Sequence, residues 1–288
     1  MRGIVALLAG VVVVGACSAP TEPDTPSPPP PTPVTSTTTP TPPTPPTPPS
    51  STRATQAPAW TVGATPLPRR ADGFGQIRPT PDVLRERALP TEDVLPPPAD
   101  GRYTSSVTAV PGDVLARSTW QSACPVTASD LRYVTMSFWG FDGKPHTGEM
   151  LVNAAQADNV ARVFGDLFAA RFPIEEMRIT SPAELDAPPT GDGNNTSAFV
   201  CRPVRGQTNW SAHAYGLAID LNPFQNPYTK DGLVLPELSS AYLDREWARP
   251  GMLLPGDATV RAFAAVGWDW GGAWREPKDR MHFTATGG

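Results

Sequence analysis

The chain has 288 residues, of which 38 are proline and only 18% are charged. Most of the prolines fall in the first hundred residues, so a packed core has to come mainly from the remaining two-thirds, 101–288. The net charge of −5 and the lack of a long basic run argue against a nucleic-acid partner. We therefore expect one domain of enzyme size behind a proline-rich arm.

The amino terminus has the pattern of an export signal. Arg2 precedes an uncharged apolar run over 4–15, which would rise only about 18 Å as a helix against the roughly 30 Å of a hydrocarbon core. We predict a signal peptide over 1–17 rather than a membrane span. Residues 14–17, Val-Gly-Ala-Cys, resemble the bacterial lipoprotein signal, in which the cysteine thiol is acylated. This predicts a lipid on Cys17 and an extracytoplasmic protein anchored to the bacterial cell membrane and facing the cell wall, with ordinary secretion as the alternative.

The cysteine count agrees with export. Three cysteines are an awkward number for an exported protein unless one of them is occupied, and lipidated Cys17 leaves an even pair. In an oxidising compartment a bridge between Cys124 and Cys201 would contribute about 4 kcal/mol in the chain-entropy model. Two free buried thiols are the alternative.

The segment over 18–59 consists largely of proline, threonine and serine, which favours extended polyproline conformation and cannot bury apolar surface. We predict a disordered spacer that reaches up to roughly 120 Å from the anchor. The segment over 60–110 is still rich in proline but carries isolated apolar groups such as Trp60, Phe74 and Leu84. Two arrangements are open for it, one wrapped over the domain surface and one loose.

The domain over 111–288 is predicted to be α+β, a small antiparallel sheet with flanking helices. Alternating residues over 131–139 and 148–152 predict a β-hairpin that turns at Asp142-Gly143. Helical spacing of apolar residues over 154–172 predicts an amphipathic helix. Further expected elements are strands near 177–180, 218–221, 268–270 and 281–283 and a helix over 259–266. No repeating βαβ pattern is present, which excludes an α/β class.

One carboxylate lies inside an apolar strand pattern, at Asp220. Burying it unpaired would cost several kcal/mol, and lysines are scarce, so an arginine or a metal ion is its expected partner. Two of the three histidines, His213 and His282, complete a catalytic zinc set of two imidazoles, one carboxylate and an open position, with Asp279 beside the bound water. Satisfied surface histidines with Asp220 bonded to backbone amides are the alternative. His146 lies on the predicted hairpin, which favours a structural or substrate-side role.

The motif Ser211-x-His213-x-x-Gly216-x-Ala218-x-Asp220, followed by Asp279-x-x-His282, resembles the zinc D-alanyl-D-alanine carboxypeptidase/dipeptidase and L-alanyl-D-glutamate peptidase family, VanY-like and with the hedgehog/DD-peptidase fold. The resemblance extends over 118–283. It implies zinc held by the two histidines and Asp220, and Asp279 as the general acid/base. Other hydrolase signatures, Ser-x-x-Lys, Gly-x-Ser-x-Gly and His-Glu-x-x-His, are absent from the sequence.

The resemblance also implies an arginine that holds a substrate carboxylate, for which Arg202 is the first candidate and Arg205 the second. It implies a substrate-bonding role for Ser211, whose alternative role is to cap a turn or helix. Aspartate instead of glutamate at position 279 and Met281 before the last histidine depart from the vancomycin-resistance dipeptidases. The shorter acid resembles the endopeptidase branch, so the cleaved bond stays open.

These observations together predict a lipid-anchored zinc peptidase that cuts peptidoglycan stem peptides for cell-wall remodelling. Two alternatives belong to other classes. A non-catalytic lipoprotein would use the same fold to bind wall peptides, and a secreted hydrolase would cut peptides that do not come from the wall.

Overall fold

The computed structural model describes residues 60–287 of the chain. The predicted signal peptide with Cys17 and the predicted spacer over 18–59 lie outside these residues. Between residues 60 and 287, no helix combines the length and the apolar character that a membrane span requires. The described residues belong to one compact unit of helices and small antiparallel sheets, which confirms the α+β class.

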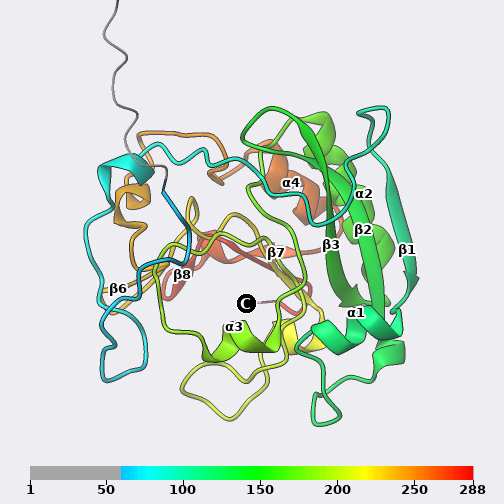
Figure 1. Cartoon of the computed structure of the whole chain (residues 1–288), viewed down its shortest axis with the longest axis horizontal. Coiled ribbons are helices and arrows are strands. Elements are labelled where there is room, and N and C mark those ends of the chain that lie inside the picture. The colour runs from blue at the N-terminus through cyan, green and yellow to red at the C-terminus, as the bar shows by residue number, and fades with distance from the viewer. Residues whose placement is uncertain (1–59, 288) are drawn as a thin grey trace, which may run out of the picture. The chain divides into compact units, whose positions relative to one another are not determined.

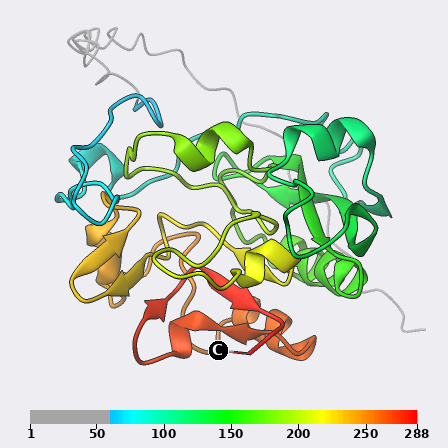
Figure 2. The same cartoon turned by 90° about the horizontal axis from the view of Figure 1, so that it is seen from below.

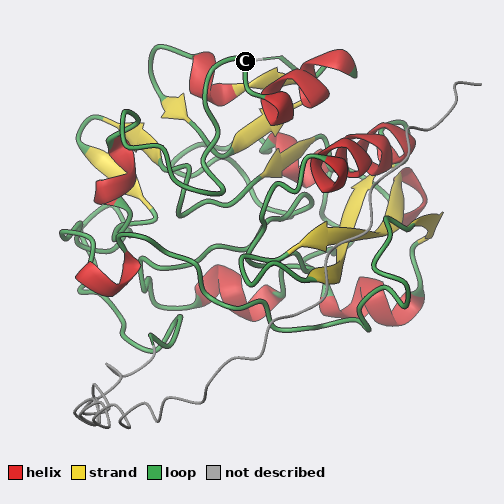
Figure 3. Cartoon of the chain, turned by 90° about the horizontal axis from the view of Figure 1, so that it is seen from above, coloured by secondary structure: helices red, strands yellow, loops and turns green. Residues whose placement is uncertain are grey.

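Short elements follow one another along the chain, and long loops join them (Figures 1 and 3). The α-helices are α1 (Gly112–Arg117), α2 (Ala157–Ala169), α3 (Pro182–Asp186) and α4 (Ala258–Ala265). The strands are β1 (Ser105–Ala109), β2 (Leu131–Trp139), β3 (Pro145–Asn153), β4 (Ala218–Asp220), β5 (Tyr228–Lys230), β6 (Leu233–Leu235), β7 (Asp269–Trp270), β8 (Lys278–Asp279) and β9 (His282–Thr284). Single turns of 3-10 helix are η1 (Asp82–Leu84), η2 (Ala128–Asp130), η3 (Ala212–Tyr215), η4 (Ser240–Leu243) and η5 (Gly271–Ala273).

The first sheet is the predicted β-hairpin with one additional strand. β2 and β3 pair antiparallel around a turn in which Gly143 has a φ of 74°, and β1 pairs with the other edge of β2. α2 packs on this sheet through an apolar face that includes Val160 and Phe164, both buried. α2 is shorter than the predicted helix over 154–172, and the chain leaves it where Arg171 takes a left-handed φ of 53°.

Two smaller sheets from the C-terminal part of the chain position the predicted site. In the first, β9 lies between β4 and β7, and the register sets Asp220 opposite His282. Their neighbours Ile219 and Phe283 are fully buried in the main core. Because successive side chains of a strand point to opposite faces, Asp220 and His282 share the face that is turned away from that core. In Figure 2, β9 is drawn in red, and η3, which carries His213, is drawn in yellow.

The predicted strand over 177–180 is wrong. Met177 and Ile179 are buried while their neighbours are not, so the sequence alternates as a strand would. The segment nevertheless forms no ladder, because only single contacts join it to its surroundings, such as Glu149 N–H donating to the Met177 carbonyl at 3.1 Å. An extended segment that lies on a core can show the period of a strand without being paired.

The proline-rich segment before β1 wraps over the domain, so the first of its two open arrangements is the one found (Figure 1). Leu67 and Leu84 are buried in a second apolar cluster together with Phe224 and Tyr242 from the later part of the chain. Regular structure in this segment is limited to η1, since its prolines remove donors for a ladder.

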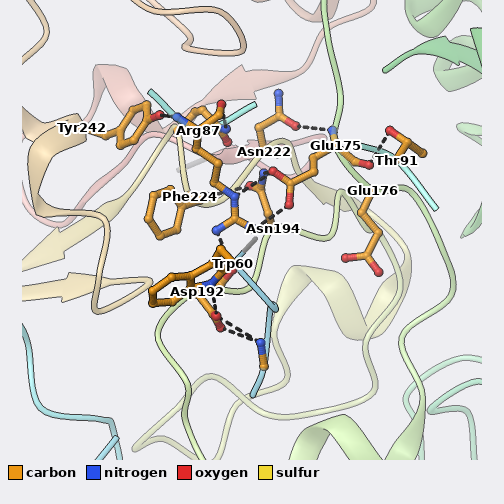
Figure 4. Close-up of polar contacts among 12 residues, drawn as sticks. Trp60, Arg87, Thr91, Glu175, Glu176, Asp192, Asn194, Asn222, Phe224 and Tyr242 are labelled. Atoms are coloured by element: carbon orange, nitrogen blue, oxygen red, sulfur yellow. Dashed lines mark hydrogen bonds and ion pairs between the residues drawn. The ribbon is translucent and has the colours of Figure 1, made fainter. Parts of the chain in front are cut away.

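A buried ion pair fastens the same segment (Figure 4). The guanidinium of Arg87 is fully enclosed and donates to both carboxylate oxygens of Glu175, at 2.7 and 2.5 Å, and to the carbonyl of Asp192 at 2.8 Å. Asn194 donates to the same carboxylate at 2.9 Å, and the indole of Trp60 donates to the Asp192 carboxylate. Removing one partner of such a pair costs about 3–5 kcal/mol, because the other charge stays buried without compensation.

The Cys124–Cys201 disulfide is present, with Cα atoms 5.8 Å apart, so the two-thiol alternative is wrong. It joins the loop after α1 to the chain just before Arg202. The bridge therefore fixes the start of the loop that leads to η3.

We expect the double variant Cys124→Ala/Cys201→Ala to lose about 4 kcal/mol of unfolding free energy, because a loop of 77 residues is no longer closed in the unfolded chain. Urea denaturation followed by tryptophan fluorescence measures the loss. Ser122→Ala, an exposed position in the same loop, is the control. A double variant as stable as the control would contradict the expectation.

Candidate metal centre

His213 is placed by a short capped turn. The Ser211 hydroxyl accepts a hydrogen bond from the His213 N–H at 3.3 Å and so caps η3, and Gly216 ends the turn with a φ of 66°. A side chain at Gly216 would collide with the backbone of Asn153 in β3. His213 Nδ1 lies 2.6 Å from the Ala198 carbonyl, which can only accept. Nδ1 therefore carries the proton, and the lone pair of Nε2 is directed into the site.

The three predicted ligands meet at one point. His282 Nδ1 and Asp220 Oδ1 are 3.1 Å apart, His213 Nε2 and His282 Nδ1 are 3.2 Å apart, and His213 Nε2 and Asp220 Oδ1 are 3.4 Å apart. Tetrahedral zinc with bonds near 2.0–2.1 Å needs ligand atoms about 3.3 Å apart. The donor set and its spacing fit zinc. The alternative interpretation required backbone amides that donate to the Asp220 carboxylate. No such hydrogen bond is present among residues 60–287.

Asp220 stays ionised. Burial acts to raise the pKa of its carboxyl, but the adjacent rings of His213 and His282 more than offset this and hold the pKa far below its usual range. An anionic carboxylate between two imidazole nitrogens is the form that binds a divalent cation.

Asp279 has the opposite character. β8 carries it, three positions before His282, and its Oδ1 is buried without a hydrogen-bond partner in the described part of the chain. Burial, followed by the nearby charge of Asp220, raises the pKa of Asp279 to about 7, while His282, Arg202 and Arg280 act against the rise. A carboxyl with a pKa near 7 can both take up and release a proton at neutral pH.

This shift predicts how the metal-free protein responds to pH. The folded-state pKa of Asp279 lies above its unfolded value of 3.8, so its neutral form stabilises the fold at low pH, and that contribution, a few kcal/mol at most, is lost as pH rises through about 7. In excess chelator, we expect the melting temperature to fall between pH 5 and pH 8 by less in Asp279→Asn than in the wild type. Asp269→Asn, an exposed site, is the control. Equal falls in all three proteins would contradict the expectation.

Of the two predicted substrate arginines, Arg202 lies nearer the centre. Its charge is among those that lower the pKa of Asp279, and the only hydrogen bond of its guanidinium within residues 60–287 goes to the neighbouring Pro203 carbonyl at 3.2 Å. Arg205 lies further along the same loop, with its guanidinium 4.4 Å from the ring of Phe74. Ser211 is buried and caps η3, and a bond from it to substrate stays a prediction.

Two aromatic residues outside the predicted set of site residues border the site, although the sequence had offered the tryptophans at 268, 270 and 274 either as cleft-lining or, preferably, as core residues. Trp274 lies with its ring 5.7 Å from that of His282, and Tyr228 of β5 lies opposite Asp279 in the strand register. Trp268 and Trp270 are packed in the core. The strand pairs β5–β8 and β7–β9 contain only two residue pairs each, too few for a periodic signal.

His146 lies outside the centre. Its Nδ1 is 2.8 Å from Asp93 and its Nε2 is 3.1 Å from Asp142, so the ring joins the hairpin to the N-terminal segment. The structural role expected from its place on the hairpin agrees with this arrangement.

Residues 205–285 match the model of a family described as D-alanyl-D-alanine carboxypeptidase. The matched region contains the three candidate ligands and Asp279, but neither Arg202 nor the segment before it. The match supports the general family that the motif resembles and supports a peptidase. Neither the curated proteins nor the solved structures contain a match to the chain.

Proposed function

We propose that this protein is a zinc-dependent peptidase that hydrolyses peptide bonds in peptidoglycan stem peptides, with a VanY-like, hedgehog/DD-peptidase type of domain. One observation carries the proposal: three ligand atoms of His213, Asp220 and His282 lie 3.1–3.4 Å apart beside the buried carboxyl of Asp279. The carboxypeptidase family match supports the substrate class.

The chain's own residues account for binding and proton transfer. Bound zinc would supply a Lewis acid that polarises the scissile carbonyl and lowers the pKa of a water to about 7. Asp279 accepts the proton of the attacking water as the new C–O bond forms. It then delivers that proton to the amine nitrogen as the C–N bond breaks, which balances the hydrolysis. Arg202 binds a carboxylate of the peptide through paired N–H donors.

We propose further that the protein is lipid-anchored through Cys17 and acts outside the cytoplasmic membrane. The support comes from the sequence of residues 1–17 and from the proline-rich spacer over 18–59, whose reach suits a target in the wall. Mass spectrometry of the mature amino terminus tests the anchor. A mature Cys17 without a diacylglyceryl group would contradict it.

Mass analysis of muropeptides before and after treatment, with and without chelator, tests the function. Release of D-alanine that stops with chelator would identify a carboxypeptidase, and a shortened stem with an internal cut would identify an endopeptidase. Zinc binding without release of any fragment would contradict the enzymatic proposal and favour a wall-peptide binder. Cleavage of protein substrates but not of muropeptides would favour a hydrolase that acts outside the wall.

A further inference from the structure

The loop over 201–211 carries two arginines, and the charge of Arg202 acts on Asp279 at the metal centre. The disulfide at Cys201 fixes the start of this loop, and its end returns to Ser211, whose N–H donates to the Arg202 carbonyl at 3.3 Å. A second bond, from the Val204 N–H to the Asn209 carbonyl at 2.8 Å, narrows the loop between these points. Arg202 is therefore held next to η3, and Arg205 lies further out along the same loop.

Arg205 is held by a segment that the family match does not include. The ring of Phe74 lies under its guanidinium at 4.4 Å, and the Phe74 carbonyl accepts a hydrogen bond from Arg70 N–H at 2.7 Å within a tight turn. Stacking on an aromatic face orients a guanidinium and leaves the N–H groups at its edge free to donate.

No acid among residues 60–287 forms a direct ion pair with Arg205. Two acids approach it, but the Glu237 carboxylate accepts a hydrogen bond from Gly75 N–H at 2.6 Å, and the Asp72 carboxylate pairs with Arg70 at 2.9 Å. In the part of the chain that the structure describes, the Arg205 guanidinium has no ion pair and no hydrogen bond.

The remaining charges near Arg205 are positive. Arg202 and Arg69 belong to the same neighbourhood, and within the described residues the Arg69 guanidinium donates only to the carbonyls of Gly73 and Ala187, at 3.3 and 3.2 Å. Burial, with Arg202 next, lowers the pKa of Arg205, and a bound anion would act in the opposite direction. An excess of fixed positive charge that begins at Arg202, near Asp279, and extends along the loop favours an anionic part of the substrate.

We propose that Arg205, oriented by Phe74, is a second carboxylate-binding position of the substrate site, so that the preferred substrate is a peptide with two carboxylates. Arg202 takes the carboxylate nearer the metal centre and Arg205 takes the one further away. The inference rests on the proposed function and deepens it. In a stem peptide, the free α-carboxylate of the glutamate residue has the required chemistry.

Two synthetic stem peptides test this inference. They are identical except that the glutamate α-carboxylate is free in one and is a carboxamide in the other. The zinc-loaded wild type is expected to cleave the free-acid peptide with a kcat/KM about tenfold to a hundredfold higher, the range of one charge-assisted hydrogen-bonding pair. Arg205→Gln is expected to lose this preference, mainly through KM, and Arg205→Lys to keep part of it because the charge remains.

Two further variants separate orientation from charge. Phe74→Leu keeps an apolar side chain but removes the aromatic face, and we expect it to reduce the preference without abolishing it. Arg162→Gln removes an exposed arginine from α2 and is expected to keep the full preference. An Arg205→Gln protein with the wild-type preference, or a wild type with none, would overturn the proposal.

Binding of the same two peptides, measured by calorimetry on the wild type and on Arg205→Gln, separates this inference from the proposed function. If neither peptide is hydrolysed, the hydrolase proposal fails, while a carboxylate preference in binding that disappears in Arg205→Gln still supports the second position. Equal affinities of the wild type for the two peptides would overturn it.

Discussion

Replacement of His282 by alanine is expected to remove zinc and hydrolysis together. The variant leaves two protein ligands, and the spacing of 3.1–3.4 Å that suits a tetrahedral ion needs all three. Zinc measured per mole of folded protein by atomic emission should fall from about one to near zero. The muropeptide assay should fall to the level of the chelated wild type.

The third histidine provides a matched control. His146 is also buried and also faces carboxylates, but it lies outside the centre, so His146→Ala should keep a full complement of zinc even if its hairpin contacts weaken. Loss of zinc from His146→Ala, or zinc retained at wild-type affinity in His282→Ala, would contradict the ligand assignment.

Replacement of Asp279 by asparagine is expected to lower kcat by about 10²–10⁴-fold while the zinc content stays unchanged. Asparagine keeps the size of the side chain but cannot accept the proton of the attacking water. Steady-state kinetics on a stem peptide, together with metal analysis of the same sample, measure both quantities.

Asp269→Asn removes an aspartate of the same region that is exposed on β7 and should leave kcat unchanged. Asp279→Asn with full activity would exclude Asp279 as the proton carrier. Loss of zinc in Asp279→Asn would instead show that the carboxyl supports the ligands.

The metal centre could be predicted because two of its ligands, His213 and Asp220, belong to one short sequence motif. From His213 to Asp220 the chain makes one capped turn, a left-handed glycine and a three-residue strand, so the spacing itself determines where both side chains point. The position of Asp220 in an apolar strand also indicated that its carboxylate needs a cation or a metal ion as a partner. The distance of this carboxylate from His282 follows from a strand pair that local sequence does not encode, so the two were joined only through the chemistry of a zinc donor set and through the family resemblance.

The surroundings of the centre could not be predicted in the same way. Tyr228 and Asp279 are opposite each other in the β5–β8 pairing, which contains only two residue pairs, and Trp274 approaches His282 from a loop. Neither arrangement produces a periodic pattern in the sequence. The stacking of Arg205 on Phe74 joins residues more than a hundred positions apart in sequence. Such contacts depend on tertiary packing, to which local propensity and spacing are insensitive.

The proline-rich segment that wraps over the domain lies before the region that the family match covers, yet the fold depends on it. The family match begins at residue 205, yet a shortened chain that started at residue 111 would lack Arg87 and would leave the charge of Glu175 enclosed without its cation. It would also uncover the rings of Phe224 and Tyr242, which Leu84 now shields from water. We therefore expect that a fragment able to fold on its own has to keep the segment with Leu84 and Arg87, and the contact of Trp60 with Asp192 favours including that residue as well.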